Sequence, residues 1–164
     1  MRFLGVDPGS HGAIAVLTED GSIHAVHDMP SVEVKVGKTK RTRVSTALLS
    51  DLMREITDMA CIVTVEDVGG FSGQSCSAAF TFGRACGQLE GVLTALQLPV
   101  AYVTPQKWKK AAGIVSDKGA AREAAMRLWP AHAHLFKRVM DADRAEACLL
   151  ARHGWLSVQR AVAA

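Results

Sequence analysis

The chain has 164 residues, of which 49% are hydrophobic, and its formal net charge is +3 with a pI near 8.8. This length suits one domain over residues 1–164 with a sizeable buried core, and the hydrophobic fraction is ordinary for a globular protein. No apolar stretch is long enough to span a bilayer, which argues against a membrane-spanning helix and against a membrane partner.

The first predicted elements are three strands joined by short turns. Residues Arg2 to Val6 and Ala13 to Leu17 are apolar, Glu19-Asp20-Gly21 is a hairpin signal, and Ser22 to Met29 alternates in polarity. Short turns between such strands favour an antiparallel meander. The following stretch, Pro30 to Val44, is polar and basic and is predicted to be a mobile loop.

The middle of the chain predicts two helices around a buried strand. Ser45 can cap a helix that runs through Met59. Cys61 to Val65 is continuously apolar, as expected for a central strand covered on both faces. A glycine-rich loop at residues 69–75 precedes a helix from about Ala78 to Leu96.

This second helix carries a row of glycines. Gly83, Gly87 and Gly91 are spaced four apart, so they form a smooth stripe on one face of the helix. Another backbone can approach such a stripe closely. The stripe therefore predicts tight packing either on the sheet or on a partner helix.

The remaining elements are a fifth strand and three helices. Val100 to Val103 is the strand, and Thr104-Pro105 begins a short helix that ends at Ala112. Ser116 or Asp117 caps a helix through Trp129, and the last helix covers about Asp143 to His153. A meander followed by crossover helices predicts an α/β fold, with a mixed five-stranded sheet and helices on both faces.

Acidic residues stand at the ends of the two most buried strands and at the start of the last helix. Asp7 and Glu66 each follow an apolar run, and Asp141, Asp143 and Glu146 crowd the helix start. If the two strands are adjacent and parallel, their carboxylates lie side by side. Such a cluster repels itself unless cations neutralise it, which predicts a divalent-metal site. The alternative is that each acid only ends a strand or caps a helix.

Basic residues gather in two regions, and a basic surface around an acidic pocket suits a polyanion such as DNA. The alternative is an ordinary solvated surface. The candidate DNA-binding cations are Lys38, Lys40, Arg41 and Arg43 in the first region and Lys107, Lys109, Lys110, Lys118 and Arg122 in the second.

Five motifs, in this order, resemble those of the RuvC family of Holliday junction resolvases, within the RNase H-like superfamily, and especially its phage and organellar branch. They are Gly5-Val6-Asp7-Pro8-Gly9, Val65-Glu66-Asp67, Ser77-Ala78-Ala79-Phe80-Thr81-Phe82-Gly83-Arg84, Val103-Thr104-Pro105-Gln106-Lys107-Trp108-Lys109, and Asp141-Ala142-Asp143-Arg144-Ala145-Glu146-Ala147. The turn after Asp7 is weak alone, because sugar kinases and chaperone ATPases have similar turns. The resemblance covers nearly the whole chain.

The resemblance implies a homodimer that cuts two opposed strands of a four-way DNA junction with magnesium. Asp7 and Glu66 match the family's first two catalytic acids, and Asp143 and Glu146 match its helical pair. The chain departs from the commonest bacterial pattern, which has aspartate where Glu146 stands. Asp141 matches an acid of the phage-like branch, so the choice between Asp141 and Asp143 stays open, although helical spacing favours Asp143.

Two magnesium ions about 4 Å apart can activate water, neutralise the phosphate and stabilise the leaving oxygen. Asp7 is placed to bridge both ions, Glu66 would complete one site, and Glu146 with Asp143 or Asp141 the other. Manganese would fit the same oxygens. Phe71, on the glycine-rich loop, is either a wedge between unstacked bases at the junction or a staple onto the core.

Other functions remain open at this point. The same active site would serve an RNA–DNA hybrid nuclease or another structure-selective nuclease. A non-catalytic junction-binding module is a further alternative, although it has no need of buried acids. An ATP-binding actin-like fragment is disfavoured, because the chain lacks a second glycine-rich loop and a second domain.

The expected location is the cytoplasm, near the nucleoid of a bacterium or a phage-infected cell. The chain starts directly with strand-forming residues, so no signal peptide is expected. The four cysteines, Cys61, Cys76, Cys86 and Cys148, lack CxxC spacing and are expected to be reduced, buried thiols.

Overall fold

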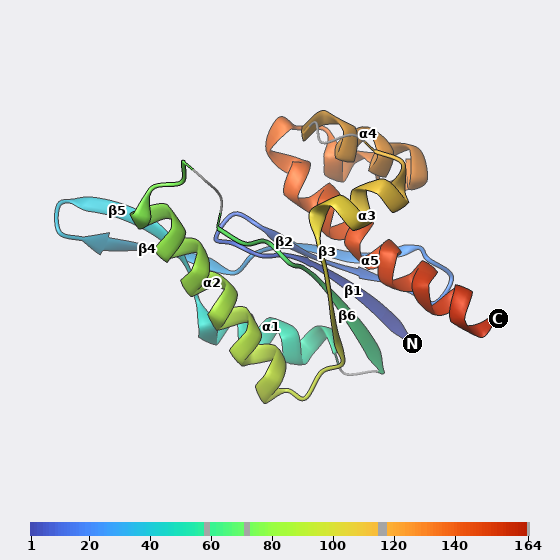
Figure 1. Cartoon of the computed structure of the whole chain (residues 1–164), viewed down its shortest axis with the longest axis horizontal. Helices are drawn as coiled ribbons and strands as arrows, with labels where there is room; N and C mark the ends of the chain where they lie inside the picture. The colour runs from blue at the N-terminus through green and yellow to red at the C-terminus, as the bar shows by residue number, and fades with distance from the viewer. Residues whose placement is uncertain (58–59, 71–72, 115–117, 164) are drawn as a thin grey trace.

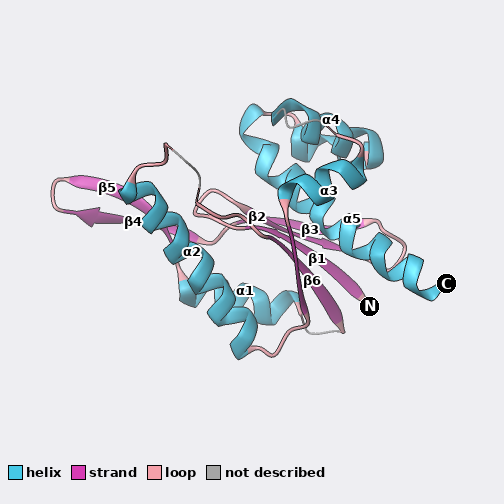
Figure 2. Ribbon diagram, in the orientation of Figure 1, coloured by secondary structure: helices cyan, strands magenta, loops and turns pink. Residues whose placement is uncertain are grey.

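Helices cover both faces of one mixed β-sheet, and a separate hairpin projects from its side (Figures 1 and 2). The computed structural model describes residues 1–57, 60–70, 73–114 and 118–163. Within these residues no helix is both long enough and apolar enough to cross a bilayer.

The sheet has five strands in the order β3-β2-β1-β6-β7, which confirms the predicted mixed sheet. The strands are β1 (Arg2–Asp7), β2 (Ala13–Leu17), β3 (Ile23–Asp28), β6 (Cys61–Glu66) and β7 (Val100–Val103). The first three form an antiparallel meander, while β6 is parallel to both β1 and β7. Strands β1 and β6 are apolar along nearly their whole length because side chains from both helical layers pack on them.

Two helices pack on one face of the sheet, α1 (Thr46–Ile56) and α2 (Cys76–Ala95). Their apolar side chains, among them Leu49 and Leu89, share a core with Val6 of β1. Ser45 caps α1 as predicted, since its hydroxyl accepts a hydrogen bond from the Leu48 N–H. The predicted last residue of this helix, Met59, lies outside the described residues.

Helix α5 (Ala142–Val162) lies directly on the other face of the sheet, and α3 (Pro105–Ala112) and α4 (Lys118–Leu128) pack against α5. Two 3₁₀ segments, η1 (Pro130–Phe136) and η2 (Val139–Asp141), connect α4 to α5. The residues predicted to cap α4, Ser116 and Asp117, lie outside the described residues.

Helix α5 crosses the sheet so closely that two glycines are required. A Cβ on Gly5 of β1 would lie 2.1 Å from the Ala147 carbonyl oxygen, and a Cβ on Gly154 would lie 2.2 Å from Thr64 Oγ1. The predicted end of this helix at His153 is therefore wrong. Gly154 does not terminate the helix, since its missing side chain lets α5 lie directly on β6 and continue to Val162.

The basic stretch after β3 is a hairpin, which corrects the prediction of a mobile loop between Pro30 and Val44. Strands β4 (Ser31–Val36) and β5 (Thr39–Val44) pair antiparallel as a two-stranded sheet. Valines alternate with charged residues along β4, which is the pattern of a strand exposed on one face. Gly37 turns the chain with a positive φ of 61°.

Two further expectations are corrected. The glycine row of α2 does not pack on the sheet, because a Cβ built on Gly83, Gly87 or Gly91 would meet no described atom within 4 Å. The cysteines are free thiols, but only Cys61 and Cys148 are buried, whereas Cys86 is half-buried and Cys76 is exposed at the start of α2.

Candidate metal centre

Two acidic side chains lie next to each other at one edge of the sheet. Strands β1 and β6 are parallel, and Val6 pairs with Val65. The residues that follow, Asp7 and Glu66, are therefore neighbours at the carboxyl ends of their strands. The sequence prediction of adjacent parallel strands with adjacent carboxylates is confirmed.

Helix α5 brings a third carboxylate to the same point. The close crossing at Gly5 holds Ala147 against β1, and Glu146 precedes Ala147 on the helix. One carboxylate oxygen from each of Asp7, Glu66 and Glu146 lies within 4.8 Å of the other two. We refer to these three residues as the acidic triad.

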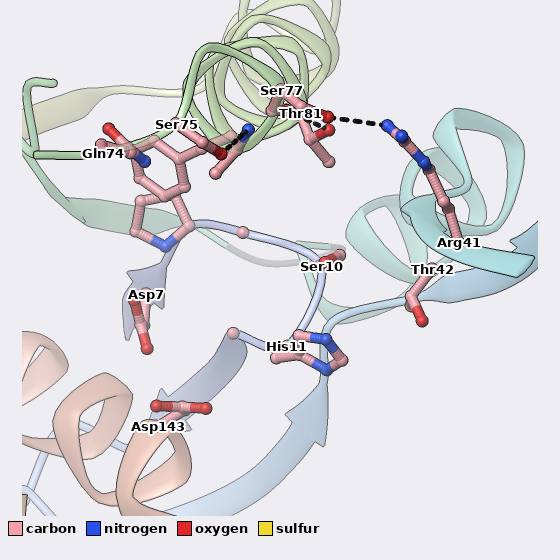
Figure 3. A pocket seen from close by; sticks show the side chains of 15 residues that line it. Asp7, Ser10, His11, Arg41, Thr42, Gln74, Ser75, Ser77, Thr81 and Asp143 are labelled. Atoms are coloured by element: carbon pink, nitrogen blue, oxygen red, sulfur yellow. Dashed lines mark hydrogen bonds between the residues drawn. The ribbon is translucent and has the colours of Figure 1, made fainter. Parts of the chain in front are cut away.

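The two aspartates near the start of α5 face different neighbours. Asp143 lines the same pocket as Asp7, and its charge acts on the Asp7 carboxyl (Figure 3). Asp141 is buried and accepts hydrogen bonds from Arg138, with Nη2 to Oδ1 at 2.8 Å and the backbone N–H to Oδ2 at 2.8 Å. Arg144 Nη1 lies 3.7 Å from Asp141 Oδ1 as well. Asp141 is thus held in arginine contacts, whereas Asp143 borders the acidic triad.

The electrostatics of the triad are those of crowded anions. The pKa of Asp7 is raised well above its ordinary value, first by burial and then by the charges of Asp143, Glu66 and Glu146. Burial also raises the pKa of Glu66, against a lowering effect of its hydrogen bond. By contrast, the pKa of Asp141 is lowered, chiefly by the Arg138 hydrogen bond. The positive charge close to the triad does not neutralise its carboxylates. A bound cation would reduce the repulsion between them.

A buried tryptophan orients the Glu66 carboxylate. Trp108 lies in α3, is 1% exposed, and donates a hydrogen bond from Nε1 to Glu66 Oε1 at 2.8 Å. Metal-binding side chains are commonly oriented by such outer partners. Composition alone marks Trp108 as a packing residue, and the only sequence signal for this role is that a buried indole N–H needs an acceptor.

One lysine reaches the triad. Lys109 Nζ lies 3.0 Å from Glu146 Oε1, with both side chains largely buried, and 5.1 Å from the centre of the Trp108 ring. Its charge lowers the pKa of Asp7, although burial and the neighbouring acids outweigh it. The sequence predicts Lys109 as a contact for DNA phosphates, and the structure places it at the edge of the acidic triad.

Asp7, but neither glutamate of the triad, lines a pocket of about 630 Å³ between the turn after β1, the β4–β5 hairpin and the start of α2 (Figure 3). Asp7 and Asp143 lie at one end of this pocket. Arg41 and Thr42 of β5 lie at the other end, where Arg41 Nη1 donates to Ser77 Oγ at 2.9 Å. We call this pocket the groove.

The other predicted DNA-binding residues occupy two separate regions, the hairpin and the α3–α4 region, which Figure 1 shows apart from each other. On the hairpin, Lys38 is exposed at the turn and Lys40 pairs with Glu33 at 2.9 Å. On α3, Lys107 and Lys110 are exposed. Arg122 of α4 donates to the Lys137 carbonyl at 3.2 Å. Phe71 and the side chain of Lys118 lie outside what the structure describes.

The donors at this site fit a hard divalent cation. Asp7, Glu66, Glu146 and the bordering Asp143 offer only carboxylate oxygens, which magnesium and manganese prefer. Helices and strands fix these side chains from three elements, and Trp108 fixes the orientation of Glu66. The acidic triad could therefore bind metal.

Comparisons with known proteins identify the fold. No protein-family model matches the chain, and no curated protein matches it in sequence. Among solved structures, RuvC of Thermus thermophilus in complex with a Holliday junction substrate is 14% identical, with a TM-score of 0.58 over 97% of this chain and 96% of that chain. The yeast mitochondrial Holliday junction resolvase Ydc2 is 16% identical, with a TM-score of 0.60 over 96% of this chain and 78% of that chain.

The fold is RNase H-like. A second Thermus thermophilus RuvC structure matches with a TM-score of 0.57 at 15% identity. At these identities the similarity is one of fold. It agrees with the RNase H-like architecture that the motifs predict.

Proposed function

We propose that the chain is a magnesium-dependent endonuclease that resolves four-way DNA junctions. The observation that carries this proposal is the convergence of Asp7, Glu66 and Glu146 within 4.8 Å. They converge on a fold shared with Holliday junction resolvases. The run from Asp141 to Glu146 supports assignment to the phage and organellar branch, and residues 1–164 would form one nuclease domain.

Each acidic side chain would have a defined part in holding the metal. Bound magnesium would lower the pKa of a water and neutralise charge on the phosphate and the leaving oxygen. Asp7, at the centre of the cluster, would be a ligand of both ions. Glu66 would complete one site, and Glu146 with Asp143 would complete the other. Asp143 is favoured over Asp141 because Asp141 is already held by Arg138 and Arg144.

Residues around the triad would orient these ligands and the substrate. Trp108 holds Glu66 in one orientation before any ion binds. Lys109 is within reach of a phosphate at the triad, because its amine already lies at the Glu146 carboxylate. The exposed Lys107 and Lys110 would contact neighbouring phosphates, which gives affinity without sequence information.

The proposed assembly is a homodimer. The glycines of α2 form an open face, since no described atom would contact a Cβ at Gly83, Gly87 or Gly91. A second copy of α2 can approach such a face closely. A two-fold dimer would place two active sites symmetrically on a junction, whose opposed strands are related in the same way. Gel filtration is expected to give a mass near twice the 17.5 kDa of one chain.

The experiment that tests the activity compares three labelled substrates, namely a synthetic four-way junction, a linear duplex and an RNA–DNA hybrid. Each is incubated with and without Mg²⁺, using the wild-type chain and the Asp7→Asn variant. We expect paired cuts in opposed strands of the junction, only with Mg²⁺ and only by the wild-type chain. Asp7→Asn is expected to keep junction binding.

Other results would point elsewhere. Cleavage of the hybrid in preference to the junction would favour an RNA–DNA hybrid nuclease with the same metal centre. Junction binding without cleavage at any Mg²⁺ or Mn²⁺ concentration would favour a binding module. Cleavage by Asp7→Asn as fast as by the wild-type chain would contradict the proposed active site.

A further inference from the structure

Three arginines converge beside the groove, at the end away from the acidic triad. A small second pocket lies between the hairpin and α2, and it is lined by Arg41, Arg43 and Arg84, together with Phe80 and Gln88. Arg41 and Arg43 come from β5, and Arg84 comes from α2. We call this the arginine pocket.

The arginine pocket adjoins the groove. Ser10, Arg41 and Thr81 line both cavities. A single strand that runs along the groove from Asp7 past Ser10 would therefore come next to the arginines. The path has carboxylates at one end and guanidinium groups at the other.

The positive charge of the arginine pocket is not neutralised within the described part of the chain. No carboxylate lines the pocket, and none of its arginines forms an ion pair with a described acid. Other arginines of the chain do have acidic partners, such as Arg144 with Asp28. Like charges gathered in this way repel one another, and an anion between them would remove that repulsion.

The pocket is also held in shape. Arg41 Nη1 donates to Ser77 Oγ at 2.9 Å, which ties the hairpin to the first turn of α2. Gln88 Nε2 donates to the Val44 carbonyl at 3.3 Å and to Thr46 Oγ1 at 2.6 Å, which ties the base of the hairpin to the same helix. The two sides that carry the arginines are therefore fixed relative to each other.

We propose that Arg41, Arg43 and Arg84 bind one backbone phosphate of the same strand whose scissile phosphate lies at the acidic triad. This inference rests on the proposed nuclease function. Guanidinium groups match phosphate oxygens with paired hydrogen bonds and are the usual protein groups for this contact. Phe80, which is 70% exposed beside the pocket, offers an aromatic face to an adjoining sugar or base. The arginine pocket would fix which phosphodiester bond reaches the metal ligands.

The test uses the full chain with Arg43 and Arg84 both changed to glutamine. Neither arginine has a described ion pair or hydrogen bond, so the melting temperature is expected to stay near that of the wild-type chain. The matched control is Arg54→Gln on α1, which removes an exposed arginine whose only described ion-pair partner is Asp51 at 3.8 Å. Binding of a four-way junction is measured by fluorescence anisotropy in EDTA over a range of salt concentrations.

We expect the double variant to raise the junction Kd about tenfold. The slope of log K against log salt should fall by about one, because one phosphate contact is lost. In Mg²⁺, the KM should rise while kcat at saturating junction stays near the wild-type value, and the mapped cuts should spread to neighbouring phosphodiester bonds. Arg54→Gln should bind and cleave like the wild-type chain.

Two outcomes would overturn the inference while leaving the nuclease function intact. In the first, the double variant keeps the wild-type Kd, salt slope and cut positions. In the second, millimolar inorganic phosphate stabilises the wild-type chain but not the double variant, while junction binding is the same for both, so that the pocket takes a free anion instead of a strand. Failure of the proposed function has a different signature, because the wild-type chain itself would then leave the junction uncut.

Discussion

Replacing Trp108 with phenylalanine should weaken metal binding through Glu66, although residue 108 touches no metal. The substitution keeps an aromatic ring in the core and removes the 2.8 Å hydrogen bond from Nε1 to Glu66 Oε1. A hydrogen bond to a charged group contributes about 1.5–3 kcal/mol. Loss of a partner that orients a metal ligand typically lowers metal affinity or activity about 10- to 100-fold.

The assay is calorimetric titration of the metal-free chain with Mn²⁺, followed by junction cleavage at saturating and limiting Mg²⁺. The matched control is Trp129→Phe, which also removes a hydrogen bond from a buried indole, here to the Gly21 carbonyl at 3.0 Å, on another part of the fold. Both variants should be less stable, but only Trp108→Phe should lose metal affinity. Equal Mn²⁺ affinities for the two variants would refute the positioning role of Trp108.

Three further predictions follow from the same geometry. Asp7→Asn should raise the melting temperature in metal-free buffer at pH 7–8. Because the pKa of Asp7 is raised in the folded chain, wild-type stability falls as pH rises from the ordinary carboxyl range through the raised pKa, whereas the amide carries no charge. Mg²⁺ should then stabilise only the wild-type chain, and a variant that melts below the wild-type chain would contradict this prediction. Asp143→Asn should lose metal affinity on calorimetric titration, whereas Asp141→Asn should keep metal affinity and lower stability by about 1–3 kcal/mol at pH 7. Because the pKa of Asp141 is lowered in the folded chain, the stability that its carboxylate contributes is present above the ordinary pKa and is lost in acid melts as pH falls through the folded pKa. Equal effects of both substitutions on metal binding would reopen the choice between Asp141 and Asp143. Gly5→Ala should force α5 away from β1, costing about 1–3 kcal/mol and lowering Mn²⁺ affinity, while Gly69→Ala, where a Cβ meets no described atom, should change neither.

The sequence predicts the part of the site that depends on regular strands. Asp7 and Glu66 each end an apolar run, and two parallel strands place their carboxyl ends at the same edge of a sheet. The sheet order then makes them neighbours. For Glu146, motif order and helical spacing supply the prediction, because residues three apart share a helix face.

What the sequence misses depends on tertiary contacts. Asp141 matches a family acid by position, yet its carboxylate is held by Arg138 and Arg144, each three residues away along the chain, and the motif match does not take these pairs into account. Gly154 resembles a helix terminator, while in the fold it gives room to Thr64. Trp108 counts as apolar in any hydrophobicity pattern, so its single polar atom goes unnoticed.

The hairpin shows a different limit. Its charged residues predict a loop, because neither β4 nor β5 has a continuous apolar face and the alternation of valines is short. Backbone pairing between β4 and β5 holds the hairpin in shape, because few of its side chains are buried. As a result, the arginine pocket, which needs β5 and α2 side by side, could not be predicted from the sequence.

The most direct test of the central claim is a crystal structure of the chain grown with Mn²⁺ and measured at the manganese absorption edge. We expect anomalous peaks at the acidic triad, with a carboxylate oxygen of Asp7 as a ligand and Glu66 and Glu146 completing the coordination. Peaks elsewhere on the surface, with none at Asp7 in millimolar Mn²⁺, would contradict that claim.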